Sequence, residues 1–320
     1  MNKTQIEILN SLDDKKYVSG QDIADNLGIS RAAISKNIKS LKDNYQIDIF
    51  SNSKIGYLLD EKLDLINQDE LEKDFKNVNY FYSIDSTSKY AIENQRNLKD
   101  NAIVITEHQT DGFGRFNRKW ISPFGKNIYC TLVEIVDLDI SKLNGLSLVI
   151  AISITKVLNR LNLDAKLKWP NDIYINDKKI GGVIINISAE INDRAKLFIG
   201  FGLNVNMRNN QDITKNWTSI KLESNRHANR TNLLIQIINT IREDLIIFTK
   251  EGFSSFKKNY ENLNYLKDKE FTLILADKKF TNCKYKGLSG IGEIIIENNN
   301  GSYSFSSGDI SILDSSINSK

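Results

Sequence analysis

The spacing of apolar residues changes twice along this chain of 320 residues, and those changes limit the folds open to it. Up to about residue 62, apolar residues recur at helical spacing and then alternate as in a short hairpin. From about 78 to 268 strand and helix signals alternate, and beyond about 269 only short strand signals remain. One core cannot serve three such patterns, and the length suits two or three domains. We expect domains at residues 1–62, 63–268 and 269–320.

The middle and last segments predict an α+β multidomain fold class. In the middle segment, strands are expected at residues 102–107, 127–134, 167–169, 172–175, 179–187 and 196–206. Helices are expected there at residues 87–94, 143–161 and 232–249. In the last segment, strands are expected at residues 271–275, 280–285, 293–297 and 303–305. Turns of Gly, Asn and Asp separate these last strands, so a small β-barrel of about five strands is indicated.

Composition narrows the classes of protein that fit. Hydrophobic residues make up 40% and charged residues 26% of the chain, as in folded globular proteins. The net charge of +3 is too small to indicate a polyanion partner by itself. Two cysteines form no disulfide framework, and two histidines, His108 and His227, leave no multi-histidine metal site, so no metal site is predicted. No apolar run approaches the ~20 residues that span a bilayer, so we expect a cytoplasmic protein without a membrane partner.

The first 62 residues have the spacing of a helix-turn-helix. Three apolar stripes precede the hairpin, and Gly28 separates the second stripe from the third. Ala24 allows the helices to cross closely, Gly28 permits a left-handed turn, and Ile34 fills the shared core. Ser30 stands at the N-cap position of the third helix. A polar turn at residues 51–54 then joins two short strands, so we expect a winged helix.

Basic side chains concentrate on the third predicted helix, which has four cations and no acid between residues 30 and 42. The start of such a helix reads base edges, and lysines meet phosphates. The residues expected to contact DNA are Ser30, Arg31, Ser35, Lys36, Lys39 and, in the wing, Lys54. Residues 1–62 hold nine basic and nine acidic side chains, so a winged helix used only for protein contacts remains the alternative.

A loop with two glycines and three cations follows the first expected strand of the middle segment, and it reads HQTDGFGRFNRKW. Gly112 and Gly114 leave backbone N–H groups open to an anion. Arg115, Arg118 and Lys119 place three positive charges within five residues, and arginine can grip a carboxylate or phosphate with two hydrogen bonds. We predict an anionic ligand at this loop, with a flexible surface turn as the alternative.

A second candidate segment reads Lys-Trp-Pro-Asn-Asp, from Lys168 to Asp172, and precedes a strand with Lys179 and two glycines. Pro170 ends one strand, and the next two residues turn into another. A lysine beside glycines on a buried strand is costly unless it meets an anion. The segment therefore predicts cations that face a ligand, with a hairpin of solvated lysines as the alternative.

Smaller signals concern the walls of such a pocket. Ser86, Thr87 and Ser88 open a helix, where their hydroxyls could bind a neutral polar ligand or only cap the helix. Asn204 follows two glycines on an expected strand. Glycines there indicate either a bend in the sheet or close approach of the backbone to a ligand.

Together, and in this order, these segments resemble biotin–protein ligases. The resemblance rests on Ser86–Ser88, the loop Gln109–Trp120, the Ser-Pro-Phe-Gly run after it, Lys168–Asp172 and the Lys-Ile-Gly-Gly run from Lys179. With the helix-turn-helix in front, the chain resembles the bifunctional class, in which the ligase also represses the biotin operon. The resemblance implies a winged helix, a class II synthetase-like central mixed sheet with helices on one face, and a C-terminal SH3-like barrel.

The resemblance also implies a two-step reaction with biotin and MgATP as substrates. Biotin and ATP form biotinyl-5′-adenylate, and a lysine of the biotin carboxyl carrier protein of acetyl-CoA carboxylase then takes the biotin. Catalytic positions carried over from the family are Lys179, Arg115, Arg118, Lys168 and Asp172. Biotin-binding positions are Ser86, Thr87, Ser88, Gln109, Gly112, Phe113, Gly114, Arg115 and Lys179. Nucleotide-binding positions are Arg118, Trp120 and Asn204.

For the repressor, the resemblance implies a ligand-promoted homodimer on operator DNA of biotin biosynthesis genes. The chain also departs from the family. In the loop pattern Gly-Arg-Gly-Arg-x-Gly-Arg, Phe113 replaces the first arginine and removes a cation. Asn117 replaces the last glycine and can accept the left-handed conformation that the glycine had. Leu313 stands where an arginine is often found, which puts a catalytic role of the barrel in doubt.

Three alternatives stay open. A lipoate–protein ligase shares the fold and the adenylation chemistry. A biotin-sensing repressor without catalysis would bind biotin or its adenylate and do no more. A ligase whose helix-turn-helix no longer binds DNA cannot be separated from the bifunctional protein by sequence.

Overall fold

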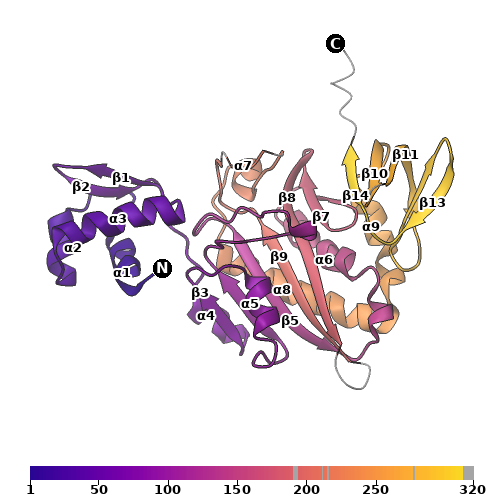
Figure 1. Cartoon of the computed structure of the whole chain (residues 1–320), viewed down its shortest axis with the longest axis horizontal. Coiled ribbons are helices and arrows are strands. Elements are labelled where there is room, and N and C mark those ends of the chain that lie inside the picture. The colour runs from indigo at the N-terminus through magenta and orange to yellow at the C-terminus, as the bar shows by residue number, and fades with distance from the viewer. Residues whose placement is uncertain (190–193, 211, 215, 277, 313–320) are drawn as a thin grey trace, which may run out of the picture.

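The computed structural model describes residues 1–189, 194–210, 212–214, 216–276 and 278–312. It contains a two-stranded, a seven-stranded and a five-stranded sheet. Each sheet is formed within one of the three segments that the sequence separates, and the three lie in a row along the molecule (Figure 1). We propose on this basis that the domain boundaries lie near residues 62 and 268.

The N-terminal segment forms the expected winged helix. Its elements are α1 (Lys3–Ser11), α2 (Gly20–Leu27), α3 (Arg31–Tyr45), β1 (Ile49–Asn52) and β2 (Gly56–Leu59). Gly28 ends α2 in the left-handed conformation, with φ 66°. The Ser30 side chain accepts the Ala33 N–H and so caps α3. Ile8, Ile23, Ile34 and Leu41 form a core between the three helices.

The central sheet has the strand order β3-β4-β5-β9-β8-β7-β6. The strands are β3 (Val78–Phe81), β4 (Ala102–Thr106), β5 (Ile128–Val136), β6 (Lys166–Lys168), β7 (Asp172–Ile175), β8 (Lys178–Ala189) and β9 (Ala195–Leu203). Only the pairing of β3 with β4 is parallel among the described strands of this sheet, so the sheet is mixed, as expected.

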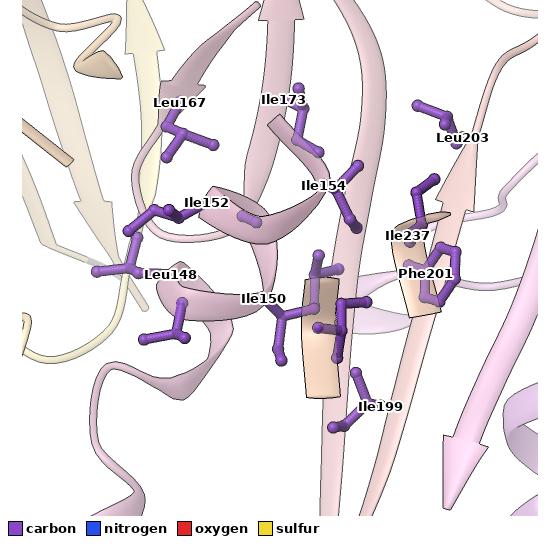
Figure 2. Close-up of a cluster of buried hydrophobic side chains, with 14 of the residues drawn as sticks. Leu148, Ile150, Ile152, Ile154, Leu167, Ile173, Ile199, Phe201, Leu203 and Ile237 are labelled. Carbon is purple, nitrogen blue, oxygen red and sulfur yellow. The ribbon is translucent and has the colours of Figure 1, made fainter. Parts of the chain in front are cut away.

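Two long helices, α6 (Leu146–Arg160) and α8 (Arg230–Glu251), cover one face of this sheet. Apolar side chains of α6, from Leu148 to Ile154, pack there against strand residues such as Ile173 and Ile199 (Figure 2). The short helix α5 (Thr87–Glu93) lies on the opposite face, where Ala91 packs near Val104. The strands alternate large apolar residues toward both faces because both are covered. Ser86–Ser88, at the start of α5, lie on this second face of the sheet.

The segment from Ile140 to Arg160 is long and apolar enough to cross a membrane by length and composition. In the folded chain 61% of its most apolar window is buried, and α6 within it is the central helix of the core. Helix α6 begins only at Leu146, because Gly145 has a left-handed φ of 81° and separates the helix from a 3-10 turn at Ile140–Leu143.

The C-terminal segment is a five-stranded antiparallel sheet in the order β13-β12-β11-β10-β14, consistent with an SH3-like domain. Its strands are β10 (Glu270–Leu275), β11 (Lys278–Leu288), β12 (Ile294–Asn298), β13 (Gly301–Phe305) and β14 (Asp309–Ile312). Leu313 lies outside the described residues.

Several short elements were not predicted from the sequence. These are α4 (Gln68–Asp74), β3, α7 (Ile220–Ser224), α9 (Lys257–Leu263), β14 and the 3-10 turns Arg115–Asn117 and Phe253–Phe256. In α4, for example, only Leu71 is buried, so no apolar period could mark the helix. Its N-cap Asn67 and two acids in the first turn are the signals that remained in the charged stretch.

Candidate ligand-binding site

A chain of buried hydroxyl groups lies at the start of α5. The Ser86 side chain caps the helix by accepting the Lys89 N–H at 3.4 Å. The hydroxyl of Thr131, on β5, lies 3.0 Å from the Ser88 Oγ and donates to the Thr87 Oγ1 at 2.9 Å. All four side chains are buried. Ser86 therefore caps the helix, and the hydroxyls of Thr87, Ser88 and Thr131 form one hydrogen-bonded cluster, whose role in ligand binding stays a prediction.

Gln109 connects this cluster to the glycine–arginine loop, which we call the ligand loop (Gln109–Trp120). Its Oε1 accepts the Thr87 N–H at 3.0 Å, and its Nε2 donates to the Ser122 Oγ at 3.0 Å. Gly112 lies against the same side chain, because a Cβ there would come within 2.7 Å of Gln109 Nε2 and of the Trp120 carbonyl. No other residue fits this corner without a shift of the chain.

Two glycines on β9 let the strand come close to the hydroxyl cluster and to Trp120 of the ligand loop. A Cβ at Gly200 would lie 2.4 Å from the Ser88 Oγ. A Cβ at Gly202 would lie 2.6 Å from the Trp120 ring. Because β9 pairs in register with both neighbours through this region, a bend in the sheet is not the reason for these glycines. Close packing against the site side chains is the reason.

Lys179 lies at the centre of the predicted site. Its Nζ donates to Asp172 Oδ1 at 2.6 Å and lies 5.5 Å from the centroid of the Trp120 ring. Both charged side chains are about one quarter to one third exposed, at 30% and 24%. The ammonium group is therefore held by one carboxylate and one aromatic face and remains partly exposed.

The other predicted cations differ in their surroundings. Arg115 donates to the Asn171 Oδ1 at 3.3 Å, and burial lowers the pKa of its guanidinium against the opposing effect of Asp172 and Asp309. Lys168 lies over the ring of Tyr174, with its Nζ 5.2 Å from the ring centroid and 3.5 Å from the hydroxyl. Arg115 therefore lies beside the Lys179–Asp172 pair, whereas the Lys168 ammonium contacts an aromatic residue of β7.

Arg118 reaches across to the C-terminal domain. Its Nη2 contacts Asp309 Oδ2, in β14, at 2.5 Å, and this hydrogen bond raises the pKa of the guanidinium. Phe113 is half-buried, and its backbone pairs with that of Lys119 as a single antiparallel β-bridge. Gly114 donates its N–H to the Arg118 carbonyl at 2.8 Å, so the ligand loop folds back as a narrow turn.

Two of the three predicted nucleotide-binding residues have polar atoms inside the fold. The Trp120 Nε1 is buried and has no hydrogen-bond partner among the described residues. Asn204 donates to the Thr218 carbonyl at 3.0 Å and is only 4% exposed, so its amide is engaged within the fold. An indole N–H without a partner is a donor that a bound polar ligand can satisfy.

The residues predicted to contact DNA share one exposed surface of the winged helix. All six, which are Ser30, Arg31, Ser35, Lys36, Lys39 and Lys54, are exposed. Arg31 donates to the Ser53 carbonyl at 3.4 Å and so joins the first turn of α3 to the wing. Their role in DNA binding stays a prediction.

Sequence reasoning missed several residues that complete the site. These are Ser122, Thr131, Asn171 and Asp309, which contact Gln109, Thr87, Arg115 and Arg118 respectively. Thr131 had a signal, because it is a hydroxyl residue within an otherwise apolar, fully buried strand. Asp309 had none, because it lies 191 residues beyond Arg118 in the chain and only the fold brings the two together.

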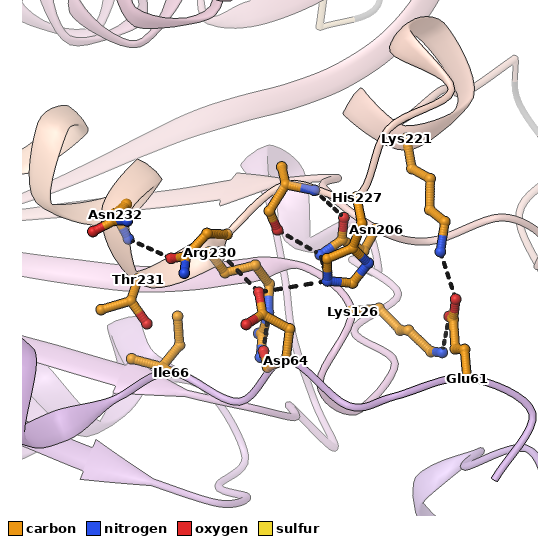
Figure 3. A network of polar contacts seen from close by, with 12 residues as sticks. Glu61, Asp64, Ile66, Lys126, Asn206, Lys221, His227, Arg230, Thr231 and Asn232 are labelled. Carbon is orange, nitrogen blue, oxygen red and sulfur yellow. Dashed lines mark hydrogen bonds and ion pairs between the residues drawn. The ribbon is translucent and has the colours of Figure 1, made fainter. Parts of the chain in front are cut away.

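The segment after the wing, from Glu61 to Ile66, which we call the linker, is held to the central domain by a polar network (Figure 3). Glu61 accepts from Lys126 and from Lys221, the latter at 2.5 Å. Burial would raise the pKa of Glu61, but these two lysines outweigh it and lower the pKa to about 2. A cavity of about 770 Å³ opens beside this linker, lined mainly by polar residues of the linker and of the α7 region such as Arg208 and His227.

A fully buried ion pair continues the network. Arg230, at the start of α8, donates to Glu107 Oε2 at 2.7 Å, and neither side chain is exposed. The other carboxylate oxygen of Glu107 accepts the Ile66 N–H from the linker at 2.7 Å. Glu107 lies two residues before the ligand loop begins at Gln109. The same buried carboxylate therefore holds both the linker and the start of the ligand loop.

Comparisons with known proteins agree with this arrangement. The model of the biotin/lipoate A/B protein ligase family matches residues 80–204, and that of a helix-turn-helix domain matches residues 4–58. The bifunctional ligase/repressor BirA of Salmonella typhimurium is 32% identical over 297 residues, covering 91% of this chain and 92% of the relative. The protein of the same name from Escherichia coli is 31% identical over 301 residues, covering 92% and 93%.

A solved structure gives the same answer. Biotin protein ligase from Aquifex aeolicus, in complex with biotin and ATP, superposes with a TM-score of 0.65 and 30% identity, and covers 75% of this chain and 100% of its own. The chain has the fold of this solved ligase, and it is 32% and 31% identical to the two relatives over more than nine-tenths of their length. The chain therefore belongs to the biotin–protein ligase family, in the class with an N-terminal helix-turn-helix that is named bifunctional ligase/repressor.

Proposed function

We propose that this chain is an ATP-dependent biotin–protein ligase and a biotin-responsive repressor. It forms biotinyl-5′-adenylate from biotin and MgATP and transfers biotin to a lysine of the biotin carboxyl carrier protein of acetyl-CoA carboxylase. The observation that carries the proposal is the position of Lys179, paired with Asp172 and lying over Trp120. Arg115 contacts Asn171, the neighbour of Asp172 in the chain, and Gly200 and Gly202 of β9 lie against Ser88 and Trp120 respectively.

The first step has an electrostatic difficulty that these cations address. A biotin carboxylate must attack the α-phosphate of ATP, and the two anions repel each other. In our proposal Lys179 leaves Asp172 to contact both groups, while Arg115 and Arg118 take the phosphates with Mg²⁺ bound to ATP. Pyrophosphate then leaves, and no residue of the chain needs to form a covalent bond.

The neutral end of biotin suits the hydroxyl cluster. Ser88, Thr87 and Thr131 form a buried row of donors and acceptors, and Gln109 adds an amide. A ureido group has both N–H donors and a carbonyl acceptor, so it can satisfy such a row. In the second step the carrier lysine attacks the adenylate carbonyl, and the same cations stabilise the departing AMP.

ATP–pyrophosphate exchange tests this proposal directly. We expect exchange that requires both biotin and ATP, followed by transfer of labelled biotin to a carrier fragment. Exchange without transfer would show that the chain forms the adenylate but does not transfer biotin to the carrier. No exchange with biotin, under conditions where biotin binds, would favour a biotin-sensing repressor without catalysis. Exchange with lipoate instead of biotin would favour a lipoate–protein ligase.

For the repressor half, we propose that biotinyl-5′-adenylate promotes a homodimer whose two winged helices bind a palindromic operator of biotin biosynthesis genes in the cytoplasm. Support comes from the exposed basic surface of α3 and the wing, and from the helix-turn-helix match. In a gel-shift titration, operator affinity should rise when biotin and ATP are both supplied. An affinity that stays the same with both substrates would leave a ligase without ligand-dependent repression.

A further inference from the structure

A buried lysine lies at the end of α5 that is opposite to the hydroxyl cluster. Lys196, on β9, is only 6% exposed, and its Nζ donates to the carbonyls of Gln95 at 2.6 Å and Leu98 at 2.8 Å. Both carbonyls belong to the segment that directly follows α5. No carboxylate pairs with Lys196 in the part of the chain that the structure describes. A buried ammonium is costly unless its partners compensate for lost water, so these two contacts matter for the fold.

The partners of Lys196 lie where a cation is favourable. The last carbonyls of a helix have no partner within the helix, and the aligned peptide dipoles leave a partial negative charge at that end. A lysine or arginine in the last helical turn often binds these carbonyls. Helix α5 has no basic residue in its last turn. Lys196 therefore supplies, from a neighbouring strand, a positive charge that the helix sequence lacks.

Strand β9 contacts α5 and the segment after it at three positions along one face. Lys196 holds the segment after the helix. Phe198 shares a hydrophobic cluster with Ala91, in the middle of α5, and Gly200 lies against Ser88, in its first turn. Alternate residues of a strand face the same side, and β9 pairs in unbroken register with β5 and β8 through this stretch. The helix is therefore attached at both ends to one central strand.

We propose that Lys196 is a positioning residue for biotin, which anchors the end of α5 and so holds the hydroxyls of Thr87 and Ser88 in place. The role in biotin binding rests on the proposed function, whereas the anchor itself does not. Groups that hydrogen-bond a ligand must be held to within about 0.5 Å by their surroundings. Without the anchor, the end of α5 is held by apolar contacts, which are not directional. Lys196 itself does not touch the substrate.

A neutral variant of the full chain tests the role in biotin binding. Lys196→Gln should raise the Kd for biotin about three- to tenfold, because the hydroxyl cluster is then held less precisely. In pyrophosphate exchange, the KM for biotin should rise by a similar factor. The KM for MgATP should stay near the wild-type value, since the predicted nucleotide-binding residues lie outside α5. Lys196→Arg keeps a cation with several donors and should restore part of the loss.

Lys156→Gln is the matched control for a general loss of stability. The Lys156 Nζ contacts Asp244 Oδ1 at 2.8 Å and joins α6 to α8, on the other face of the sheet. This variant should lower the melting temperature and leave the Kd for biotin unchanged. Wild-type biotin affinity in a folded K196Q variant overturns the proposal. An equal loss of biotin affinity in K156Q, at a similar melting temperature, overturns it as well.

Hydrogen exchange tests the anchor without relying on the reaction. In K196Q without biotin, the amides of residues 90–98 should exchange about tenfold faster than in the wild type, while those of α8 keep their rates. In the wild type, biotin should slow exchange of the same amides by linkage. If K196Q does not fold, this wild-type comparison decides, and exchange that biotin leaves unchanged overturns the proposal. If the wild type binds no biotin, the proposed function fails, while exchange without biotin still tests the anchor.

Discussion

At the scale of single residues, the predicted site depends on how the Lys179 side chain is oriented. Asp172 offers a carboxylate at 2.6 Å and Trp120 an aromatic face at 5.5 Å. A carboxylate alone would hold the ammonium strongly, and an aromatic face alone would orient it weakly. The combination leaves the lysine able to exchange Asp172 for an anionic ligand when one enters.

Lys179→Gln should lower the rate of biotin-dependent pyrophosphate exchange by about two orders of magnitude or more, because the developing charge then loses its fixed partner. Lys178→Gln is the matched control, since that neighbour is exposed and should keep the wild-type rate. Steady-state exchange kinetics of both variants, with biotin binding measured separately, check this. A K179Q variant with wild-type kcat would remove Lys179 from the proposed chemistry.

At the scale of elements, strand β9 serves both halves of the site with two residues of the same face. Gly200 faces Ser88 of the hydroxyl cluster, and Gly202 faces Trp120 on the nucleotide side. Residues two apart on a strand point the same way, and their spacing of about 7 Å separates two subsites. In the proposed site, the strand would therefore place biotin and ATP next to each other by its periodicity.

Alanine at these two glycines should separate the effects. Gly200→Ala pushes on Ser88 and should raise the Kd for biotin more than the KM for ATP, whereas Gly202→Ala pushes on Trp120 and should do the reverse. Each change should also cost about 1–3 kcal/mol of stability, as overpacking usually does. Isothermal titration with biotin and exchange kinetics with varied ATP measure both effects. The same selectivity in both variants would argue against two subsites along β9.

At the scale of the whole molecule, the winged helix is packed against the part of the central domain that leads into the ligand loop. Tyr45, at the end of α3, lies edge-on to His108 and to Phe124, with ring centroids 5.4 and 6.1 Å apart. Phe124 belongs to the hydrophobic core of the winged helix. His108 precedes Gln109, so the two domains meet one residue before the ligand loop begins.

This contact should make stability depend on pH. Burial, with the nearby N-terminal charge, lowers the pKa of His108 from 6.5 to about 4. Between these values the unfolded chain binds a proton that the folded chain does not, so the free energy of unfolding falls as pH drops from about 6.5 to 4. The loss from His108 is at most about 3 kcal/mol, and it is absent above pH 6.5.

Urea unfolding of the wild type and of His108→Gln at pH 7.0 and 5.0 measures this loss, and the variant should lose less stability between the two pH values. His227 also has its pKa lowered by burial, so His227→Gln is the necessary comparison. Glu61 stays ionised over this range, since its pKa is about 2. Equal pH dependence of the wild type and H108Q would show that His108 is not buried at a domain contact.

Much of this protein was determined by local sequence. The helix-turn-helix followed from Gly28 and a capping serine, the strands of the sheet from their apolar runs, and the site segments from residues close in the chain. These are short-range effects of backbone sterics, capping and periodicity, which a sequence displays directly. The family's fold and the class of its reaction follow from them through the resemblance.

Only the tertiary structure decided which distant residues meet. The contact of Asp309 with Arg118 joins residues 191 apart, and the contact of Arg230 with Glu107 joins residues 123 apart. No local rule predicts such pairs, because a single charged residue in a strand or at a helix start has many possible partners until the sheets and helices are packed. The contact of the ligand loop with the C-terminal domain and the burial of His108 both depend on that packing.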